Sequence, residues 1–143
     1  MGDLTKDFSR HEFACRGNSC CGHSAPISPI LVAALQLLRD HLSIIRGADT
    51  PILIVSGFRC LTHDRALAQK RGASPVAIAA RNSQHCLGLA ADIRVDVLDP
   101  STVVQEAEKI LPFRSGGIGR YTGTRARSIH LDCRTTGPAR WRD

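Results

Sequence analysis

Ser83-Gln84-His85-Cys86-Leu87-Gly88-Leu89-Ala90-Ala91-Asp92-Ile93 is the most informative stretch of this chain. His85 precedes Gly88, which permits a sharp turn, and Asp92 lies in a strand expected around residues 91–95. Small residues after the turn allow the backbone to pack closely. A neutral imidazole and a carboxylate are both ligands that Zn²⁺ accepts readily. The stretch therefore predicts a turn and a strand that together present two metal ligands.

A second histidine stands far downstream, in Ile129-His130-Leu131-Asp132. If this run is a strand, His130 and Asp132 point to the same face, because side chains alternate along a strand. One of them can then bind a metal while the other sits beside it. Three protein ligands with an open fourth position are the catalytic form of a zinc site, and such a metal lowers the pKa of its bound water to about 7.

Helices and strands are mixed along the rest of the chain. Ser28 and Pro29 suit the cap and first position of a helix, and apolar residues recur at helical spacing until Gly47. Because no regular βαβ alternation follows, the fold class is predicted to be α+β. The expected helices cover residues 29–47, 63–70 and 99–111, the last ended by Pro112; the expected strands cover 51–55, 91–95, 116–121 and 128–133; residues 73–84 form a loop or short helix, and 1–27 are irregular.

Length and composition indicate one globular domain over residues 1–143, with the Cys-rich segment 1–27 as part of it. The chain is 43% hydrophobic and 22% charged, and its formal charge is +6. This charge suits polyanions, yet no helix carries clustered basic residues and no aromatic series is present, so no nucleic-acid partner is expected. Residues 1–9 show no signal-peptide pattern, and no window reaches the roughly 20 apolar residues that span a bilayer.

The six cysteines fall into a cluster, Cys15, Cys20 and Cys21, and three dispersed residues, Cys60, Cys86 and Cys133. No C-x-x-C pair is present, so the sequence does not predict a zinc ribbon or a thioredoxin motif. His11 and His23 flank the cluster and could complete a small structural metal site. Free thiols and a single disulfide are the other possibilities.

Taken together, the motifs resemble the zinc D-alanyl-D-alanine carboxypeptidase family, which shares its fold with the hedgehog signalling domain. The two metal motifs quoted above carry most of the resemblance. It extends over nearly the whole chain, through Asp7-Phe8-Ser9-x-x-Glu12-Phe13, Ser56-Gly57-Phe58-Arg59, His63-Asp64, Gly116-Gly117-Ile118-Gly119-x-Tyr121 and Trp141.

The resemblance implies a mononuclear zinc site, held by His85, Asp92 and His130, on a small antiparallel sheet flanked by helices. Arg59 matches the position that holds a substrate carboxylate or polarises the scissile carbonyl, which suits a bidentate guanidinium. A structural arginine that caps helix carbonyls is the alternative. Of the remaining site residues, Ser83 and Gln84 are expected to line the substrate groove, and Tyr121 to hydrogen-bond the oxyanion.

One position departs from the family pattern. Many members place a glutamate three residues before the final histidine as general base, and this chain has Arg127 there. Asp132 is the predicted substitute, because strand alternation turns it toward the metal. It could instead orient His130 from behind. His63 is a weaker candidate for the base.

The resemblance implies zinc-dependent hydrolysis of peptide bonds that involve D-amino acids in peptidoglycan stem peptides or crosslinks. The enzyme would be a D-Ala-D-Ala carboxypeptidase or a murein endopeptidase, and we expect a monomer. The alternative is a zinc-containing cell-wall or protein binding module without turnover. Since no export signal is visible, we expect cytoplasmic synthesis and action at the cell wall, as in phage or prophage lysis or in a virion, or an exported protein whose signal is absent from this sequence.

Overall fold

A five-stranded sheet forms the centre of the molecule, as seen in a computed structural model that describes residues 1–143. The strands lie in the order β1-β2-β4-β3-β5. The first four pair in antiparallel fashion, whereas β5 pairs in parallel with β3 at one edge. The predicted α+β class is confirmed. The strands are β1 (Leu53–Ser56), β2 (Ala90–Arg94), β3 (Gly117–Arg120), β4 (Ser128–Asp132) and β5 (Ala139–Arg142).

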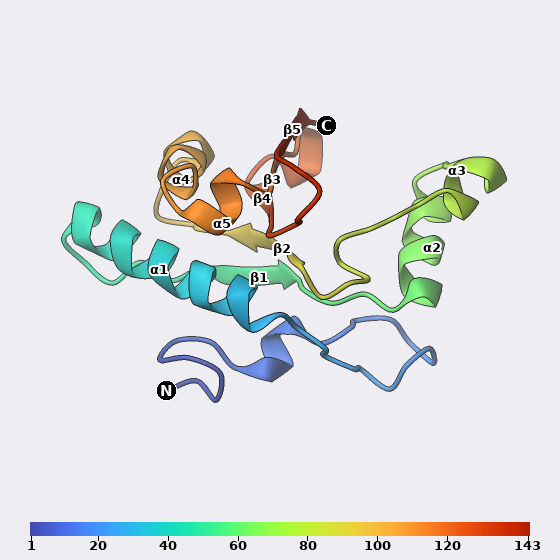
Figure 1. The fold of residues 1–143 in the computed structure, drawn as a ribbon, viewed down its shortest axis with the longest axis horizontal. Coiled ribbons are helices and arrows are strands. Elements are labelled where there is room, and N and C mark those ends of the chain that lie inside the picture. The colour runs from blue at the N-terminus through green and yellow to red at the C-terminus, as the bar shows by residue number, and fades with distance from the viewer.

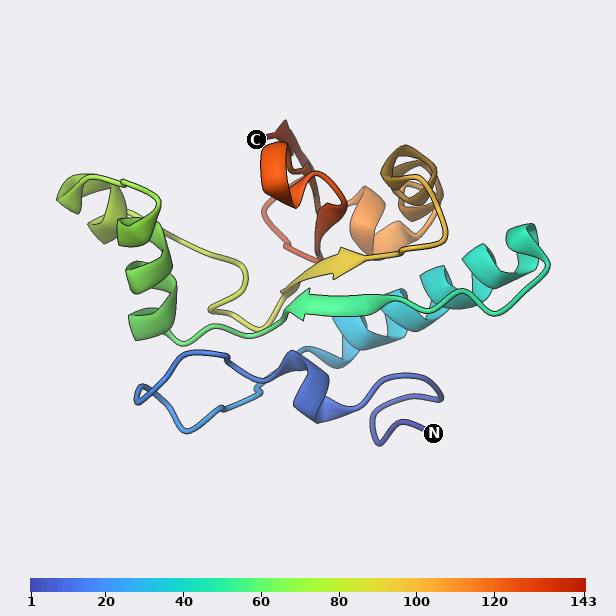
Figure 2. The ribbon, with the colours of Figure 1, turned by 180° about the vertical axis from the view of Figure 1, so that it is seen from behind.

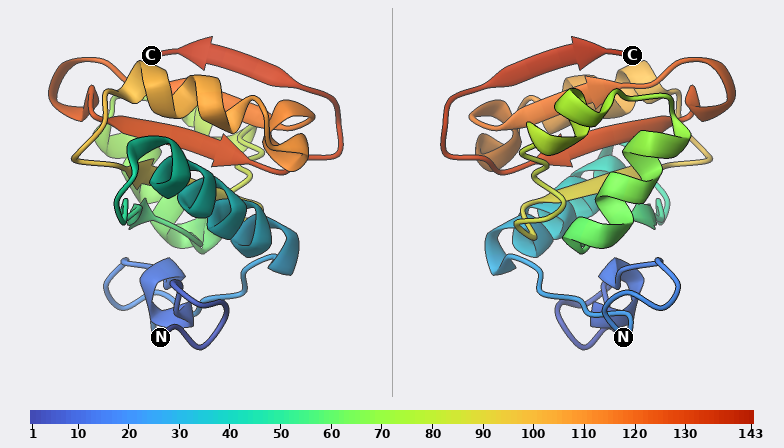
Figure 3. Two further views of the ribbon diagram at one scale, coloured as in Figure 1. Left: turned by 90° about the vertical axis from the view of Figure 1, so that its left-hand side faces the viewer. Right: turned by 90° about the vertical axis from the view of Figure 1, so that its right-hand side faces the viewer.

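Helices lie on both sides of this sheet. Figure 3 shows α1 and α4 nearest the viewer on one side and α2 and α3 nearest the viewer on the opposite side. None of the helices is both long and apolar enough to cross a membrane. The helices are α1 (Pro29–Arg46), α2 (Leu61–Lys70), α3 (Pro75–Ala79), α4 (Pro100–Ala107) and α5 (Leu111–Arg114), with short 3₁₀ turns η1 (Arg10–Phe13) and η2 (Gly123–Arg125).

Helix α1 begins and ends where the sequence predicts. Ser28 is its N-cap, Pro29 occupies the first turn, and Gly47 adopts a left-handed conformation with φ of 73° at the C-cap. Glycine is favoured there because it has no Cβ to clash. The face toward the sheet is apolar, and each fully buried leucine contributes about 1.5–3 kcal/mol. The buried leucines are Leu31, Leu35, Leu38 and Leu42.

The two faces of the sheet differ in chemistry. Ile93 of β2 and Ile129 of β4 belong to a core cluster of 20 buried residues that also includes the apolar face of α1. Because side chains alternate along a strand, the intervening residues, Asp92 in β2 and His130 in β4, point to the opposite face. The sheet therefore buries one face in the core and presents polar side chains on the other, the side of α2 and α3 (Figure 3).

The N-terminal segment runs beside β1, at the edge of the fold farthest from the C-terminus (Figures 1 and 2). Its aromatic residues Phe8 and Phe13 are fully buried. The carbonyl of Phe13 accepts a hydrogen bond of 2.8 Å from the backbone of Phe58. Gly57 allows this approach, since a Cβ there would lie 2.6 Å from Phe13 Cα. Although it is irregular apart from η1, the segment is packed into the same core.

Two details differ from the prediction. The helix expected over residues 99–111 ends at Ala107, and Pro112 lies in the first turn of the separate helix α5 instead of ending a helix. Proline is tolerated there because a first-turn N–H has no intrahelical partner. Strand β5 was not predicted. Its sequence, Ala-Arg-Trp-Arg, has no buried residue, and only pairing with β3 makes it a strand.

Candidate metal centre

One row of residues crosses the polar face of the sheet. Asp92 of β2 is paired with His130 of β4, which is paired in turn with Gly119 of β3. Ser56 of β1 lies opposite Asp92, and Trp141 of β5 lies opposite Gly119. Directly opposed residues have Cβ atoms about 4.5–5.5 Å apart. The register alone therefore brings the Asp92 carboxylate and the His130 imidazole side by side.

His85 enters the same place from the turn before β2. Its Nδ1 lies 2.7 Å from the carbonyl oxygen of Gly57, to which it donates. The turn passes through Gly88, whose φ is 70° and where a Cβ would lie 2.3 Å from the carbonyl oxygen of Pro26. The ring of His85 meets that of His130 edge-on at a centroid distance of 5.0 Å. His85 thus completes a group of three potential ligands.

The ligand atoms have the spacing of a tetrahedral site. Asp92 Oδ1 lies 3.1 Å from His130 Nδ1 and 3.4 Å from His85 Nε2, and the three atoms lie within 4.8 Å of one another. Zinc bonds of about 2.0–2.1 Å at tetrahedral angles separate two ligands by about 3.3 Å. All three residues are at most 6% exposed.

The protonation of these groups also fits a cation. His85 Nε2 is buried and has no hydrogen-bond partner. Since Nδ1 of the same ring donates to Gly57, Nε2 carries a lone pair directed at the group. A buried lone pair beside a carboxylate is the arrangement that a bound metal ion satisfies.

His130 is held from behind by Asp132. Nε2 of His130 donates to the Asp132 carboxylate over 2.8 Å, which leaves Nδ1 facing Asp92. Asp132 also accepts hydrogen bonds from the backbone of Gly117 and from Arg134. It is completely buried, and although burial opposes ionisation, Arg134 and His130 lower its pKa. Asp132 is ionised and fully engaged in hydrogen bonds.

Arg59 and Tyr121 contact Asp92 from the side. Arg59 donates to Asp92 Oδ2 over 2.7 Å, to Asp64 over 3.3 Å and to Ser56 over 3.0 Å. It is 4% exposed and is ion-paired with both Asp92 and Asp64. The hydroxyl of Tyr121 donates to Asp92 Oδ1 over 2.8 Å and therefore lies beside the three ligand atoms.

A cavity of about 200 Å³ opens next to Asp92. Besides Arg59, His63 and Tyr121, its walls include Arg16, Arg71 and Arg125. Arg125 pairs with Asp143, whereas Arg71 has no acidic partner. Partial burial, together with the charges of Arg125 and Arg59, lowers the pKa of Arg71. Burial and the charge of Arg59 likewise lower the pKa of His63, which keeps its imidazole neutral.

Unlike Arg59, the cavity residues Arg16 and Arg71 were not assigned to the site from the sequence, because neither lies within the metal motifs. Ser83 and Gln84, expected to line the groove, are not among the residues that line this cavity. Their role in binding stays a prediction. Arg127 lies outside the site and donates to the carbonyl oxygen of Asp96 over 2.9 Å.

Of the comparisons with known proteins, the match to a family profile agrees with this geometry. A search of curated proteins finds no match to the chain. The profile of a family described as peptidase M15 matches residues 6–132, a span that contains His85, Asp92, His130 and Asp132. The match covers most of the chain, so this protein belongs to the peptidase M15 family, metallopeptidases of the zinc D-alanyl-D-alanine carboxypeptidase type.

Proposed function

We propose that this protein is a zinc-dependent peptidase that hydrolyses peptide bonds in peptidoglycan stem peptides. The proposal rests on the buried group of His85, Asp92 and His130, which lies beside an arginine-lined cavity. Within this group, His85 Nε2 has no hydrogen-bond partner. The three side chains would hold Zn²⁺ and leave a fourth position open toward the cavity. When bound, the ion would supply a water of lowered pKa and polarise the scissile carbonyl.

Tyr121 is the proposed donor to the oxyanion. Burial and the nearby Asp92 carboxylate raise the pKa of its phenol, which therefore keeps its proton at neutral pH. A protonated hydroxyl beside the ligand atoms can donate to an oxygen that gains negative charge during the reaction. Arg59 would act mainly by holding the Asp92 carboxylate in place, because its guanidinium is already bonded to Asp92 and Asp64.

Two residues, Asp132 and His63, are candidates for the general base that accepts a proton from the attacking water. Asp132 is ionised, but it is completely buried and its oxygens already accept hydrogen bonds from His130, Arg134 and Gly117. These contacts support a positioning role, with Asp132 orienting His130. His63 lines the cavity with a neutral imidazole, the form that accepts a proton. We therefore propose His63 as the general base.

The charge of the cavity supports a substrate with a free carboxylate. Arg71 is a cation without an acidic partner on the cavity wall, and Arg16 and Arg125 add positive charge near it. A terminal carboxylate close to the scissile bond would satisfy this charge, and it is the feature that distinguishes a carboxypeptidase from an endopeptidase. We propose removal of a terminal D-alanine as the reaction, by a monomer acting at the cell wall.

A non-catalytic binding module is the second candidate. Its support is Arg127, which stands where many relatives have a glutamate and which hydrogen-bonds to Asp96 outside the site. A module of this kind would bind stem peptides and zinc without releasing a product.

The test compares the parent with His85→Ala on a stem peptide that ends in D-Ala-D-Ala. We expect the parent to release D-alanine, to lose this activity on chelation and to regain it with added Zn²⁺. His85→Ala should lack both activity and the zinc of this site. A C-terminally amidated peptide should be a poor substrate. Binding of the peptide by the zinc-loaded parent without any product would favour the binding module instead.

A further inference from the structure

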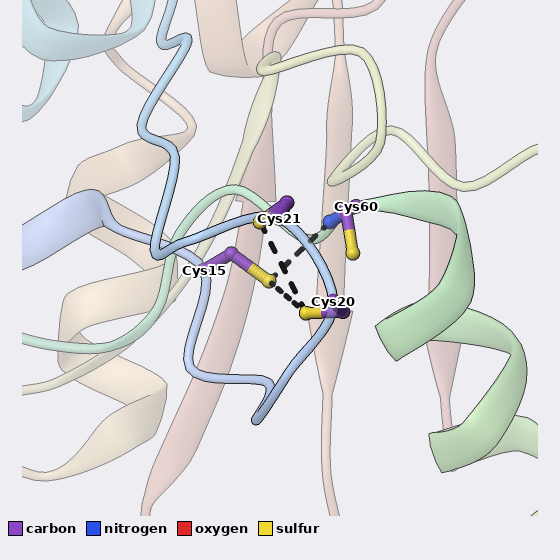
Figure 4. Close-up of side chains that lie close together, drawn as sticks. All are labelled: Cys15, Cys20, Cys21 and Cys60. Carbon is purple, nitrogen blue, oxygen red and sulfur yellow. Dashed lines mark hydrogen bonds between the residues drawn. The ribbon is translucent and has the colours of Figure 1, made fainter.

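Four cysteines meet on the side of the molecule where the N-terminal segment approaches helix α2. Cys15, Cys20 and Cys21 come from the loop after η1, and Cys60 is the N-cap residue of α2 (Figure 4). Their four sulfur atoms lie within 4.8 Å of one another. Cys20 Sγ lies 4.0 Å from both Cys15 Sγ and Cys21 Sγ. None of the four is in a disulfide.

We propose that Cys15, Cys20, Cys21 and Cys60 bind a structural zinc ion. Zinc–thiolate bonds of about 2.3 Å at tetrahedral angles place the sulfurs about 3.8 Å apart, close to the observed separations. A disulfide would require sulfurs about 2.05 Å apart. A site with four protein ligands and no open position is the structural form of zinc coordination.

Two backbone N–H groups are directed at sulfur atoms of the cluster. The backbone N–H of Cys60 is directed at Cys15 Sγ over 3.5 Å, and the N–H of His63 at Cys60 Sγ over 3.4 Å. Such donors stabilise negative charge on metal-bound sulfur. Gly17 makes room for the cluster, because a Cβ at this position would lie 2.6 Å from Cys20 Sγ.

The loop that carries three of the ligands is held by single hydrogen bonds, among them those from the backbone of Cys15 to the carbonyl oxygen of Ser24 and from Arg16 to that of Ile54. Between η1 and α1 no helix or strand forms. Two non-glycine residues in the loop, Ser19 and His23, have positive φ angles of 51° and 58°. Such conformations are uncommon for residues other than glycine and persist where the surroundings impose them. A metal that links the loop to α2 would impose them.

The fourth ligand, Cys60, lies far along the sequence from the other three cysteines. His23 uses Nδ1 in a contact of 2.8 Å with the carbonyl oxygen of Cys15, and neither His11 nor His23 belongs to the group of four. Cys60 takes the place that a histidine was expected to fill. It is 39 residues after Cys21 in the numbering, so no short spacing motif could indicate it.

The proposed ion lies behind one wall of the cavity. Cys60 directly follows Arg59, which holds Asp92, and precedes His63 by one turn of α2. The ring of His63 packs against Gly17, where a Cβ would lie 2.8 Å from it. The ion would therefore fix the N-terminal loop against the two residues that line the cavity beside Asp92, and it would act as a positioning element without touching the substrate.

Metal content tests the proposal on the full chain purified with zinc and without chelator. The parent should hold two zinc ions, His85→Ala one, the double variant Cys20→Ser/Cys21→Ser one, and the three changes combined none. Cys86→Ser, which removes a thiol outside the cluster, should keep two. With Co²⁺ in place of zinc, His85→Ala should show the intense sulfur-to-metal charge-transfer bands of a tetrathiolate site. Absence of these bands, or a parent with zinc at the histidine site alone, would overturn the proposal.

A second measurement leaves the cysteine cluster unsubstituted, so it does not depend on whether the cysteine variants fold. In His85→Ala, titration with a mercurial reagent should release one zinc ion as four thiols react, detected with a chromogenic chelator. In denaturant without reductant and after chelation, all six cysteines should alkylate. Fewer than six would indicate disulfides and contradict the site. These readouts do not depend on peptidase activity, so a parent that holds the cysteine-bound zinc but cleaves nothing would reject the proposed function and leave this inference standing.

Discussion

The carboxylate of Asp132 accepts a hydrogen bond of 2.8 Å from Nε2 of His130, and the other ring nitrogen of His130 faces Asp92. Both residues lie on β4, two positions apart and on the same face of the sheet. The pairing fixes which nitrogen of His130 is offered to a metal, because a ring whose Nε2 donates to a carboxylate presents its Nδ1 lone pair on the other side.

Asp132→Asn should therefore weaken zinc binding. Loss of a partner that orients a ligand typically costs about 10–100-fold in metal affinity. We expect a zinc Kd raised by this factor, measured by competition with a chromogenic chelator, and activity that recovers at saturating zinc. Asp96→Asn, at an exposed position, is the matched control. An unchanged Kd with activity lost even at saturating zinc would instead make Asp132 the general base.

Gly119→Ala should disturb the metal centre through Trp141. The indole lies 4.8 Å from the His130 ring, and a Cβ at Gly119 would lie 2.3 Å from Trp141 Cε2. The added methyl group should displace the indole of Trp141 and thereby reduce zinc affinity. The double variant Gly119→Ala/Trp141→Ala should recover part of the lost zinc affinity, because the clash is gone.

Trp141 provides the measurement, since it is the single tryptophan. Its fluorescence should change when zinc leaves the parent protein, and this change should be smaller in Gly119→Ala. The fluorescence of the Cys20→Ser/Cys21→Ser variant should still respond to zinc at the histidine site. A zinc affinity of Gly119→Ala equal to that of the parent would show that the indole does not support His130.

Arg71→Ala should raise KM for a peptide with a free terminal carboxylate and leave kcat nearly unchanged. A hydrogen bond to a charged group contributes about 1.5–3 kcal/mol, which corresponds to roughly a 10–100-fold rise in KM. A change confined to KM indicates binding that is equal in the ground and transition states. Arg65→Ala, on the exposed side of α2, is the control. If Arg71 binds the terminal carboxylate, the parent and Arg71→Ala should have equal KM values for the amidated peptide. An unaltered KM of Arg71→Ala for the peptide with a free carboxylate would exclude this contact.

Asp64→Asn should lower the stability of the fold at neutral pH and make that stability less dependent on pH in the acid range. Asp64 is 1% exposed and accepts hydrogen bonds from Arg81 and Arg59. Burial raises its pKa, but the two arginines outweigh burial and hold the pKa below the ordinary 3.8. A depressed folded-state pKa contributes stability that is present above 3.8 and is lost as the pH falls through the folded value.

We expect Asp64→Asn to lose about 1–3 kcal/mol of unfolding free energy at pH 7, since the buried guanidinium group of Arg59 and the partly exposed one of Arg81 lose a charged acceptor. As the pH falls from 3.8 through the depressed folded-state pKa, the gap between parent and variant should narrow, because the carboxyl of the folded parent becomes protonated as well. Denaturant unfolding over a pH series measures both effects. Asp49→Asn, whose side chain is 72% exposed, should leave the curve almost unchanged. A gap that is constant with pH would show that the charge of Asp64 is not responsible.

Much of the fold, and the choice of candidate metal ligands, follow from local patterns. Helix α1 carries its cap, first-turn proline and terminal glycine within its own sequence, and these features act between neighbouring residues. Alternation along a strand is likewise local, so it correctly placed His130 and Asp132 on one face. Strand β5 has no such pattern, and the end of α4 at Ala107 depends on how the following turn packs.

The sequence by itself determined which residues could bind a metal and on which face of their strands they lie, since residue chemistry and strand periodicity are carried by each segment alone. Tertiary structure decided what those residues meet. The register of β2 against β4 brings Asp92 opposite His130, and docking of the N-terminal loop on α2 brings Cys60 to Cys15, Cys20 and Cys21. Arg71 reaches the cavity for the same reason. Contacts between distant segments depend on how the whole core packs, and no local pattern records that arrangement.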